Sequence, residues 1–383
     1  MVASSPGVGH IFPTIPTAWA LRAAGHEVVV AMSGRTDRAV GAGLPVVDVS
    51  PGVDYDKLQM EFVQRNPEMM LKPRENKDGE SGADDFQFEN IARLFAEVSA
   101  PTVDRTVELA RQWRPDAILY TPVHGTGPLA AAAVGVPAVM QGFNMVLGSE
   151  MTSAIAQSMS AHYERHGLAS DDVKPAAILD VAPPSLRRQY DEQDNVWPIR
   201  YLPYNGGGVL PQWLNEPRKR PRVTVTLGST VPGVGGIDLL QRFVEAAGTM
   251  DAEFVLALAG ADLSRLGELP DNLVPVDWVP LAQLLAVSDA VIHHGGGGST
   301  LTAAAAGVPQ YVVPHGGDNF VHAKLIRARG LGDELTPSGL DEQRLAELIE
   351  DGPMRAAARE VAAEMQVQDT FSALIPKLVD LTR

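Results

Sequence analysis

The chain of 383 residues contains no cysteine. This absence excludes disulfide bridges, zinc sites with thiolate ligands, iron–sulfur clusters and a cysteine nucleophile. Basic residues are in the minority, because 31 lysines and arginines stand against 47 aspartates and glutamates, and the net charge is −16. Nucleic acids and anionic lipids attract basic protein surfaces, so neither is expected as the main partner.

A membrane-spanning helix needs about 20 consecutive apolar residues, and the sequence contains no run of that length. The longest apolar stretch, residues 129–140, is interrupted by Gly135 and Pro137. The N-terminal segment MVASSPGVGHIFP has no basic start of the kind found in signal peptides, and it contains histidine and proline. These features predict a cytoplasmic protein without a membrane span.

What the sequence does contain is an alternation of buried β-branched runs with helical patterns. Hydrophobic residues make up 45% of the chain, and its length is typical of two domains. Such alternation predicts doubly wound parallel sheets with helices on both faces, and ligands at the carboxyl ends of the strands. The predicted strands span residues 1–3, 27–31, 45–49, 116–120, 137–142, 222–226, 253–257, 273–276, 290–293 and 310–313.

Residues 206–220, GGGVLPQWLNEPRKR, have the composition of a linker. We therefore predict an N-terminal domain over residues 1–205, a C-terminal domain over 221–365, and a helix within 366–383 that packs back on the first domain. The polar residues 54–88 are expected to form an exposed excursion. Within it, we interpret Asp54-Tyr55-Asp56 as a solvated loop rather than a metal-binding carboxylate pair.

The strongest local signal is HHGGGGST, residues 293–300, which follows a predicted buried strand. Glycines let the main chain approach a phosphate closely, and the N–H groups and dipole of a following helix favour negative charge. Ser299 and Thr300 fall where an N-cap and a first helical turn are expected. The pattern predicts an anion site made from backbone; the alternative is a glycine-rich turn that only needs positive φ angles.

Several segments together resemble one known family. They are SPGVGHIFP at 5–13, RYLPYNGGG at 200–208, LGS at 227–229, WVPL at 278–281, HHGGGGST at 293–300 and GVPQYVVPHGGDN at 307–319. The likeness covers nearly the whole chain and is to the GT-B nucleotide-sugar glycosyltransferases, more narrowly the bacterial enzymes that attach deoxysugars to polyketide and enediyne natural products. It implies an α/β GT-B fold of two Rossmann-like domains facing a central cleft.

The resemblance assigns the donor, a dTDP-sugar, to the C-terminal domain. Trp278 is implied to stack on the base, and Asp318 and Asn319 to hydrogen-bond the sugar, roles that suit an aromatic face and a carboxylate beside an amide. Asn319 is one methylene shorter than the family's usual glutamine. The other implied donor-binding positions, most of them around the pyrophosphate, are Ser229, His294, Gly296, Gly298, Ser299 and Thr300.

His10 is the candidate catalytic base for the acceptor hydroxyl. It follows a glycine-rich turn after the first strand, which predicts that its imidazole lies at the carboxyl edge of the sheet. The alternative is a histidine that caps or packs against the next helix. The family often orients this histidine with an acidic residue, whose place is taken here by Thr121, so Thr121 or the nearby His124 is the candidate orienting group.

Phe143 and Asn144 follow the fifth predicted strand and are the candidate acceptor-binding residues for a hydrophobic aglycone. His322, within a predicted helix, is interpreted as structural. The resemblance implies an inverting transfer with no metal and no cofactor beyond the dTDP-sugar co-substrate. Three alternatives remain: a C-glycosyltransferase, a nucleotide-sugar epimerase of the same fold, and an inactive auxiliary subunit. A homodimer or a helper protein also remains open as a partner.

Overall fold

The computed structural model describes most of the 383 residues. The described ranges are 1–66, 85–172, 174–188, 193–228, 241, 243–245, 247–258, 266–336 and 339–383. Ser229 therefore lies outside the described residues, as does the middle of the excursion predicted over 54–88.

Contacts within the chain divide it into two compact units. The first comprises Met1–Ala182, Gln189–Arg200 and Asp369–Arg383, and the second comprises Pro183–Arg188 and Tyr201–Gln368. The boundary thus falls before Tyr201 and not after residue 205. Residues 206–220 are part of the second unit rather than a separate linker.

Apolar packing explains why the glycine- and proline-rich segment belongs to the second unit. Leu214 is buried in one cluster with Val255 and Leu284, and Trp213 packs against the same cluster. The guanidinium of Arg222 also lies 4.8 Å from the centroid of the Trp213 ring. The composition of this segment resembles that of a linker, but its two large apolar side chains anchor it.

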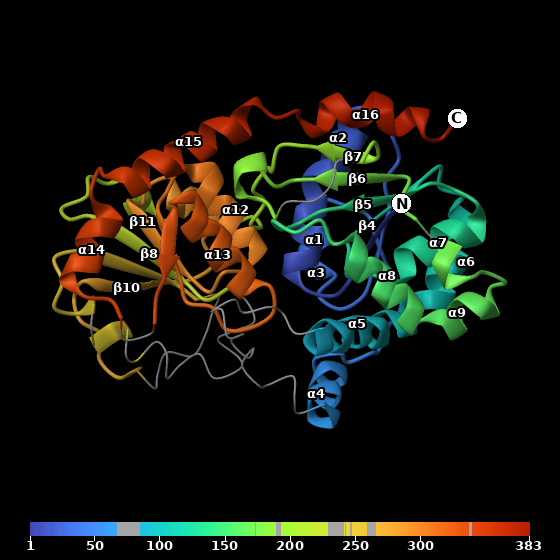
Figure 1. The fold of residues 1–383 in the computed structure, drawn as a ribbon, viewed down its shortest axis with the longest axis horizontal. Coiled ribbons are helices and arrows are strands. Elements are labelled where there is room, and N and C mark those ends of the chain that lie inside the picture. Colours follow the sequence, from blue (N-terminus) through green and yellow to red (C-terminus); the bar gives the residue numbers. More distant parts are fainter. Residues whose placement is uncertain are drawn as a thin grey trace. The chain divides into compact units, whose positions relative to one another are not determined.

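The first unit contains a parallel sheet of seven strands in the order β3-β2-β1-β4-β5-β6-β7 (Figure 1). The strands are β1 (Val2–Ser4), β2 (Val30–Met32), β3 (Val46–Asp48), β4 (Ile118–Tyr120), β5 (Ala138–Gln141), β6 (Ala177–Asp180) and β7 (Val196–Pro198). The strand order reverses between β1 and β4, which pair directly. In open α/β sheets, ligands bind outside the carboxyl ends of the strands at this switch point.

Helices cover the sheet of the first unit. They are α1 (Val8–Ile11), α2 (Ile15–Ala23), α3 (Asp37–Gly41), α4 (Tyr55–Arg65), α5 (Asp85–Ser99), α6 (Val103–Trp113), α7 (Thr126–Val134), α8 (Ser149–Ser158), α9 (Ser160–Arg165) and α16 (Phe371–Asp380). Helix α16 packs against α2, so the end of the chain lies on the first unit (Figure 1). Its inner face buries Phe371, Leu374 and Ile375.

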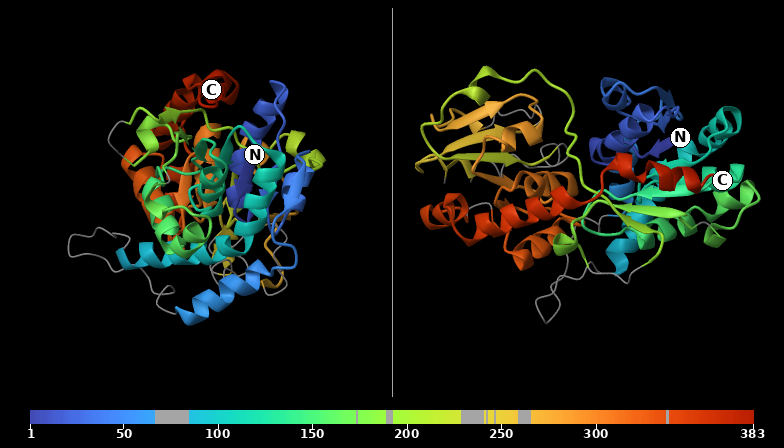
Figure 2. Two further views of the ribbon diagram at one scale, coloured as in Figure 1. Left: turned by 90° about the vertical axis from the view of Figure 1, so that its right-hand side faces the viewer. Right: turned by 90° about the horizontal axis from the view of Figure 1, so that it is seen from above.

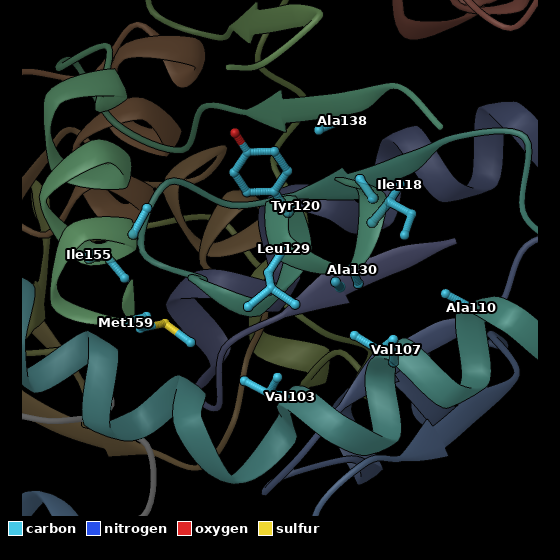
Figure 3. Packing of buried hydrophobic residues seen from close by; sticks show 14 of the residues in the cluster. Val103, Val107, Ala110, Ile118, Tyr120, Leu129, Ala130, Ala138, Ile155 and Met159 are labelled. Carbon is cyan, nitrogen blue, oxygen red and sulfur yellow. The ribbon is translucent and has the colours of Figure 1, made fainter. Parts of the chain in front are cut away.

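The main core of the first unit lies between the sheet and helices α5 to α8. Alternate side chains of β4 enter it, because Ile118 and Tyr120 belong to the cluster and Leu119 does not. Each such apolar side chain contributes about 1.5–3 kcal/mol when fully buried. Figure 3 labels ten members of the cluster: Val103, Val107, Ala110, Ile118, Tyr120, Leu129, Ala130, Ala138, Ile155 and Met159.

The second unit repeats the same topology. Its parallel sheet has the order β10-β9-β8-β11-β12-β13, with the switch between β8 and β11. The strands are β8 (Arg222–Thr226), β9 (Glu253–Ala257), β10 (Leu273–Val276), β11 (Ala290–His293), β12 (Gln310–Val312) and β13 (Gly332–Glu334). The described helices are α11 (Leu281–Leu285), α12 (Gly297–Ala306), α13 (Asn319–Arg329), α14 (Glu342–Ile349) and α15 (Pro353–Val367).

Both faces of this second sheet are buried, and helices lie on both sides of it (Figure 2). In β9, Phe254 and Leu256 point into one core, whereas Val255 points into the other. The period of two residues is that of a strand buried on both faces. The prediction of two doubly wound parallel sheets is confirmed.

Some predicted elements are wrong. Residues 55–65 form helix α4 instead of an irregular excursion, and the Asp54 carboxylate accepts a hydrogen bond from the Lys57 amide at 2.9 Å. Asp54 therefore caps a helix, whereas we had interpreted it as part of a loop. Strands β6, β7 and β13 were not predicted. Strand β13 has the sequence GDE and therefore contains no apolar run.

Among the residues that the structure describes, no helix has the length and apolar character of a membrane span.

Candidate active site

His10 lies just after the first strand, in the short helix α1. The turn between them depends on Gly7, whose φ of 108° is a conformation that side chains disfavour. The carbonyl of Gly7 accepts hydrogen bonds from the amides of His10 and Ile11 at 3.2 and 3.3 Å. His10 is therefore held on a tight helical turn at the carboxyl end of β1, beside the switch point of the first sheet.

The imidazole of His10 is partly buried between two aromatic rings. Its centroid lies 5.6 Å from that of Phe95 and 5.5 Å from that of Phe143, and both pairs are edge to face. Its Nδ1 atom is buried, so exchange of a proton with a ligand falls to Nε2. The structure thus brings His10 and the predicted acceptor residue Phe143 together in an apolar surrounding.

Asn144, the other predicted acceptor residue, follows Phe143 in the loop after β5. Its side-chain oxygen accepts a hydrogen bond from the Val146 amide at 2.9 Å. This bond shapes the loop, so the carbonyl side of the carboxamide is engaged within the protein.

The two candidate orienting groups are both buried at the end of β4. Thr121 is 0% exposed, and its hydroxyl has no hydrogen-bond partner among the described residues. It therefore does not bond to His10 in this structure. The absence of an acidic side chain at this place is not compensated by a threonine hydrogen bond.

His124 is in the tautomer whose Nε2 atom can donate a hydrogen bond but cannot accept one. Its Nδ1 accepts a hydrogen bond from the Gly127 amide at 3.1 Å, so in the neutral ring the proton is on Nε2. Burial, and secondly the charge of nearby His10, lowers the pKa of His124 to about 3. His124 is thus a neutral donor that cannot take the place of a carboxylate.

The glycine-rich segment after β11 leads directly into α12. The helix begins at Gly297, with Gly296 as N-cap in an extended conformation and no side-chain cap. Ser299 and Thr300 are consequently the third and fourth helical residues, and the expected N-cap position of Ser299 is wrong. Because the first amides of a helix have no partner within it, those of residues 297–299 point out of the N-terminus.

Ser299 and Thr300 differ in exposure. Ser299 is partly exposed at the helix terminus, whereas Thr300 is 0% exposed. The Thr300 hydroxyl is buried and bonds to no group in the described part of the chain. Ser299 is therefore the better placed of the two for contact with an anion.

His294 fits beside this terminus only because two neighbours are glycines. A Cβ atom on Gly228 would lie 2.5 Å from the His294 ring, and one on Gly296 would lie 2.4 Å from it. Gly228 follows β8, so the two strands of the switch point meet at this ring. Burial, and then the charges of His293, His315 and His322, lower the pKa of His294 to about 3, and Asp318 opposes them.

His293 anchors the start of the glycine segment. Its Nδ1 accepts from the Gly295 amide at 3.0 Å, and its Nε2 bonds to the Gln310 side-chain oxygen at 2.8 Å. Burial lowers the pKa of His293 to about 4, so the ring is neutral at physiological pH. This histidine is a structural element of the loop rather than a ligand-binding group.

Asp318 and Asn319 lie at the N-terminus of α13, which follows β12. Both side chains are partly exposed. A Cβ atom on Gly295 would lie 3.1 Å from the Cβ of Asn319, so the glycine segment and the first turn of α13 touch. The residues predicted to bind the phosphates of the donor are therefore adjacent to those predicted to bind its sugar.

Trp278 is partly buried after β10 and contacts the segment that precedes β8. A Cβ atom on Gly206 would lie 3.1 Å from the indole nitrogen of Trp278, so the chain passes the ring closely at Gly206, where φ is 80°. Ser229, the remaining predicted donor residue, lies outside the described residues.

Two positioning residues were missed by the sequence prediction. The Tyr201 hydroxyl bonds to the Gly298 carbonyl at 3.3 Å, and the Asn205 side-chain oxygen accepts from the Ala282 amide at 2.9 Å. They fasten the segment before β8 to α12 and α11. The only sequence signal was their place in RYLPYNGGG, which gives no indication of partners 97 and 77 residues away.

Comparison with known proteins identifies the class and the family. Two Rossmann-like parallel sheets are the fold of the GT-B glycosyltransferases, to which the similar solved structures belong. Residues 19–228 match the N-terminal domain, and residues 241–381 the C-terminal domain, of the erythromycin biosynthesis protein CIII-like family. The chain belongs to this family, whose members transfer deoxysugars in antibiotic biosynthesis, and the predicted family resemblance is confirmed.

Curated relatives match over almost their whole length. The elloramycin glycosyltransferase ElmGT of Streptomyces olivaceus is 36% identical, covering 96% of this chain and 93% of the relative. The L-demethylnoviosyl transferase of Streptomyces niveus is also 36% identical, covering 95% and 93%.

Solved structures of similar glycosyltransferases match the fold over nearly the whole chain. The glycosyltransferase SnogD from Streptomyces nogalater is 40% identical with a TM-score of 0.84, covering 100% of this chain and 98% of that one. The glycosyltransferase SsfS6 of Streptomyces sp. SF2575, complexed with thymidine diphosphate, is 30% identical with a TM-score of 0.81, covering 99% and 98%.

The neutral state of His124 predicts a pH dependence of stability. Because its pKa falls from 6.5 to about 3 on folding, the unfolded chain takes up a proton first as the pH falls, and stability is lost below pH 6.5. His124→Asn keeps an acceptor for the Gly127 amide but does not titrate. Between pH 6.5 and 5, urea unfolding should show wild type losing roughly 2 kcal/mol more than the variant. Equal losses would show that His124 is not held neutral.

Proposed function

We propose that this enzyme transfers a deoxysugar from a dTDP-sugar to a hydrophobic natural-product aglycone, with inversion at the anomeric carbon and without a metal ion. The observation that carries the proposal is the N-terminus of α12, whose amides project at the switch point of the second sheet beside His294. Such a terminus neutralises part of the charge of a leaving pyrophosphate.

The donor half of the proposal is supported by adjacent residues and by relatives. Trp278 offers an aromatic face for the thymine, Ser299 and the amides of Gly297 and Gly298 suit the pyrophosphate, and Asp318 and Asn319 suit sugar hydroxyls. The similar enzyme SsfS6 has been solved in complex with thymidine diphosphate, and VinC, which is 28% identical, in complex with dTDP.

The acceptor half rests on the surroundings of His10. Phe95 and Phe143 make an apolar, aromatic environment for its ring, which suits a hydrophobic aglycone. The relatives include a transferase for elloramycin and a spinosyn rhamnosyltransferase, SpnG, solved with the spinosyn aglycone.

In the proposed reaction, a hydroxyl oxygen of the acceptor forms a bond to the anomeric carbon of the donor sugar. The bond from that carbon to the pyrophosphate oxygen breaks, and its electron pair leaves with dTDP. The proton of the hydroxyl passes to Nε2 of His10. A single displacement of this kind inverts the anomeric centre, and general base catalysis typically accounts for ~10²- to 10⁴-fold of the rate.

Metal independence is tested by chelation. If the α12 terminus, rather than a divalent cation, neutralises the leaving group, the transfer rate in excess EDTA should equal the rate with added Mg²⁺. A rate abolished by EDTA and restored by Mg²⁺ would contradict this part of the proposal.

The phosphate site is tested at Ser299. Ser299→Asp places a carboxylate at the α12 terminus, where it would repel the pyrophosphate, and dTDP affinity measured by calorimetry should fall by at least about tenfold. Ser299→Asn, of almost the same size as the aspartate but uncharged, is the matched control and should lose much less. Similar affinities for the two variants would place the pyrophosphate elsewhere.

The base is tested at His10. His10→Ala should lower kcat by about 10²-fold or more while dTDP affinity is preserved, because the first unit does not supply the predicted donor residues. If most activity remains, the acceptor requires little deprotonation, and an acidic phenol or an aromatic carbon nucleophile becomes the better interpretation.

The missing carboxylate next to His10 is tested by restoring it. Thr121→Asp should shift the acidic limb of the kcat/KM–pH profile to higher pH, because an opposite charge stabilises a protonated imidazole. Thr121→Asn controls for the change of size without charge, which is needed because Thr121 is fully buried. If the limb stays in the same place in both variants, residue 121 does not act on His10.

A further inference from the structure

His322 occupies an unexpected place for a histidine interpreted as structural. It lies on α13, one turn after Asp318, and is 0% exposed. Its Nδ1 donates a hydrogen bond to the carbonyl of Gly295 at 2.7 Å. The other ring nitrogen, Nε2, faces Asp318 at 3.6 Å from Oδ2, which is close contact but longer than a hydrogen bond.

Both backbone groups of Gly295, its amide and its carbonyl, are fixed by hydrogen bonds to histidine side chains. Its amide donates to His293 at 3.0 Å, and His293 is fixed in turn by Gln310 at 2.8 Å. Its carbonyl is the acceptor for His322. A Cβ atom at this position would lie 2.8 Å from Val312, so only glycine fits. These contacts fix the position of the loop before α12 relative to strands β11 and β12.

The same imidazole thus contacts both parts of the predicted donor site. One nitrogen holds the glycine segment, which leads into the proposed pyrophosphate terminus. The other lies against the carboxylate proposed to bind the sugar. The buried ring of His322 acts as a rigid spacer, because helix packing and the hydrogen bond to Gly295 fix its rotamer.

We propose that His322 is a positioning residue that sets Asp318 relative to the phosphate-binding loop, so that recognition of the sugar is coupled to recognition of the pyrophosphate. The inference rests on the proposed function, in which Asp318 binds the donor sugar. Small displacements of a group that orients a substrate are costly, and one hydrogen bond to a charged group corresponds to about tenfold in affinity.

Two substitutions separate the contacts of His322. His322→Asn keeps a donor at the position of Nδ1, within reach of Gly295, but has no atom in the place of Nε2. His322→Gln has a donor near the position of Nε2 and loses the one that holds Gly295. Wild type, His322→Asn, Asp318→Ala and the double variant His322→Asn/Asp318→Ala form a double-mutant cycle, in which additivity is measurable.

The measured quantity is the ratio of the Kd for dTDP to the Kd for dTDP-rhamnose, a commonly available deoxysugar donor, obtained by calorimetry. This ratio reports the contribution of the sugar alone and needs no acceptor. We expect Asp318→Ala and His322→Asn each to lower it about tenfold, with dTDP affinity within about threefold of wild type. The double variant should be no lower than Asp318→Ala, because His322 acts through Asp318.

The outcomes distinguish the inference from the function on which it rests. If wild type fails to bind dTDP, the proposed donor is wrong. If Asp318→Ala leaves the ratio unchanged, the sugar role of Asp318 fails and the inference with it. If Asp318→Ala lowers the ratio but His322→Asn does not, or if their losses multiply, the proposed function stands and the positioning role is overturned.

Loss of folding is controlled by thermal unfolding and by His322→Gln. A purely structural role would lower the melting temperature and the affinities for dTDP and dTDP-rhamnose together, leaving their ratio constant. If His322→Asn does not fold, His322→Gln tests the other contact. It should weaken dTDP binding by disturbing the loop at Gly295 while the melting temperature stays close to that of wild type, and unchanged affinity for both ligands would overturn the proposal.

Discussion

The parallel pairing of β8 with β11 is the constraint on which the donor half of the molecule depends. His293 pairs with Thr226, so the residues that follow the two strands leave the sheet side by side. Gly228 and His294 then meet, and the ring is accommodated only because Gly228 and Gly296 have no side chains. The amides at the start of α12, the contact with α13 and the bond from His322 all build on this junction.

How much of this could be predicted from the sequence depends on the range of the interactions involved. Strands β9, β10 and β11 were predicted with the observed bounds, because each is a short apolar run enclosed by polar or turn residues. Their sequence signal is local. The same is true of the glycine segment 294–298, whose composition alone indicates a close approach of the backbone.

The features that were not predicted depend on partners distant in the sequence. Tyr201 bonds to Gly298, 97 residues away, and His322 to Gly295, 27 residues away. Ser299 was misplaced as an N-cap because the preference for serine at that position is general, whereas here Gly296 takes the position without a side-chain cap. The tautomer of His124 depends on one amide hydrogen bond that only the fold creates.

Charge raises a final question, because the protein carries −16 and its proposed substrate is also an anion. Segments 293–300 and 314–322 contain no lysine or arginine, so within them the backbone amides at the helix termini are the groups that favour an anion. Burial and neighbouring histidines hold His294 neutral, with a pKa of about 3. A phosphate beside the ring would oppose both effects, because an opposite charge favours the protonated form. Under the proposed function, His294 therefore avoids a buried charge in the free protein, and a bound donor would raise its pKa.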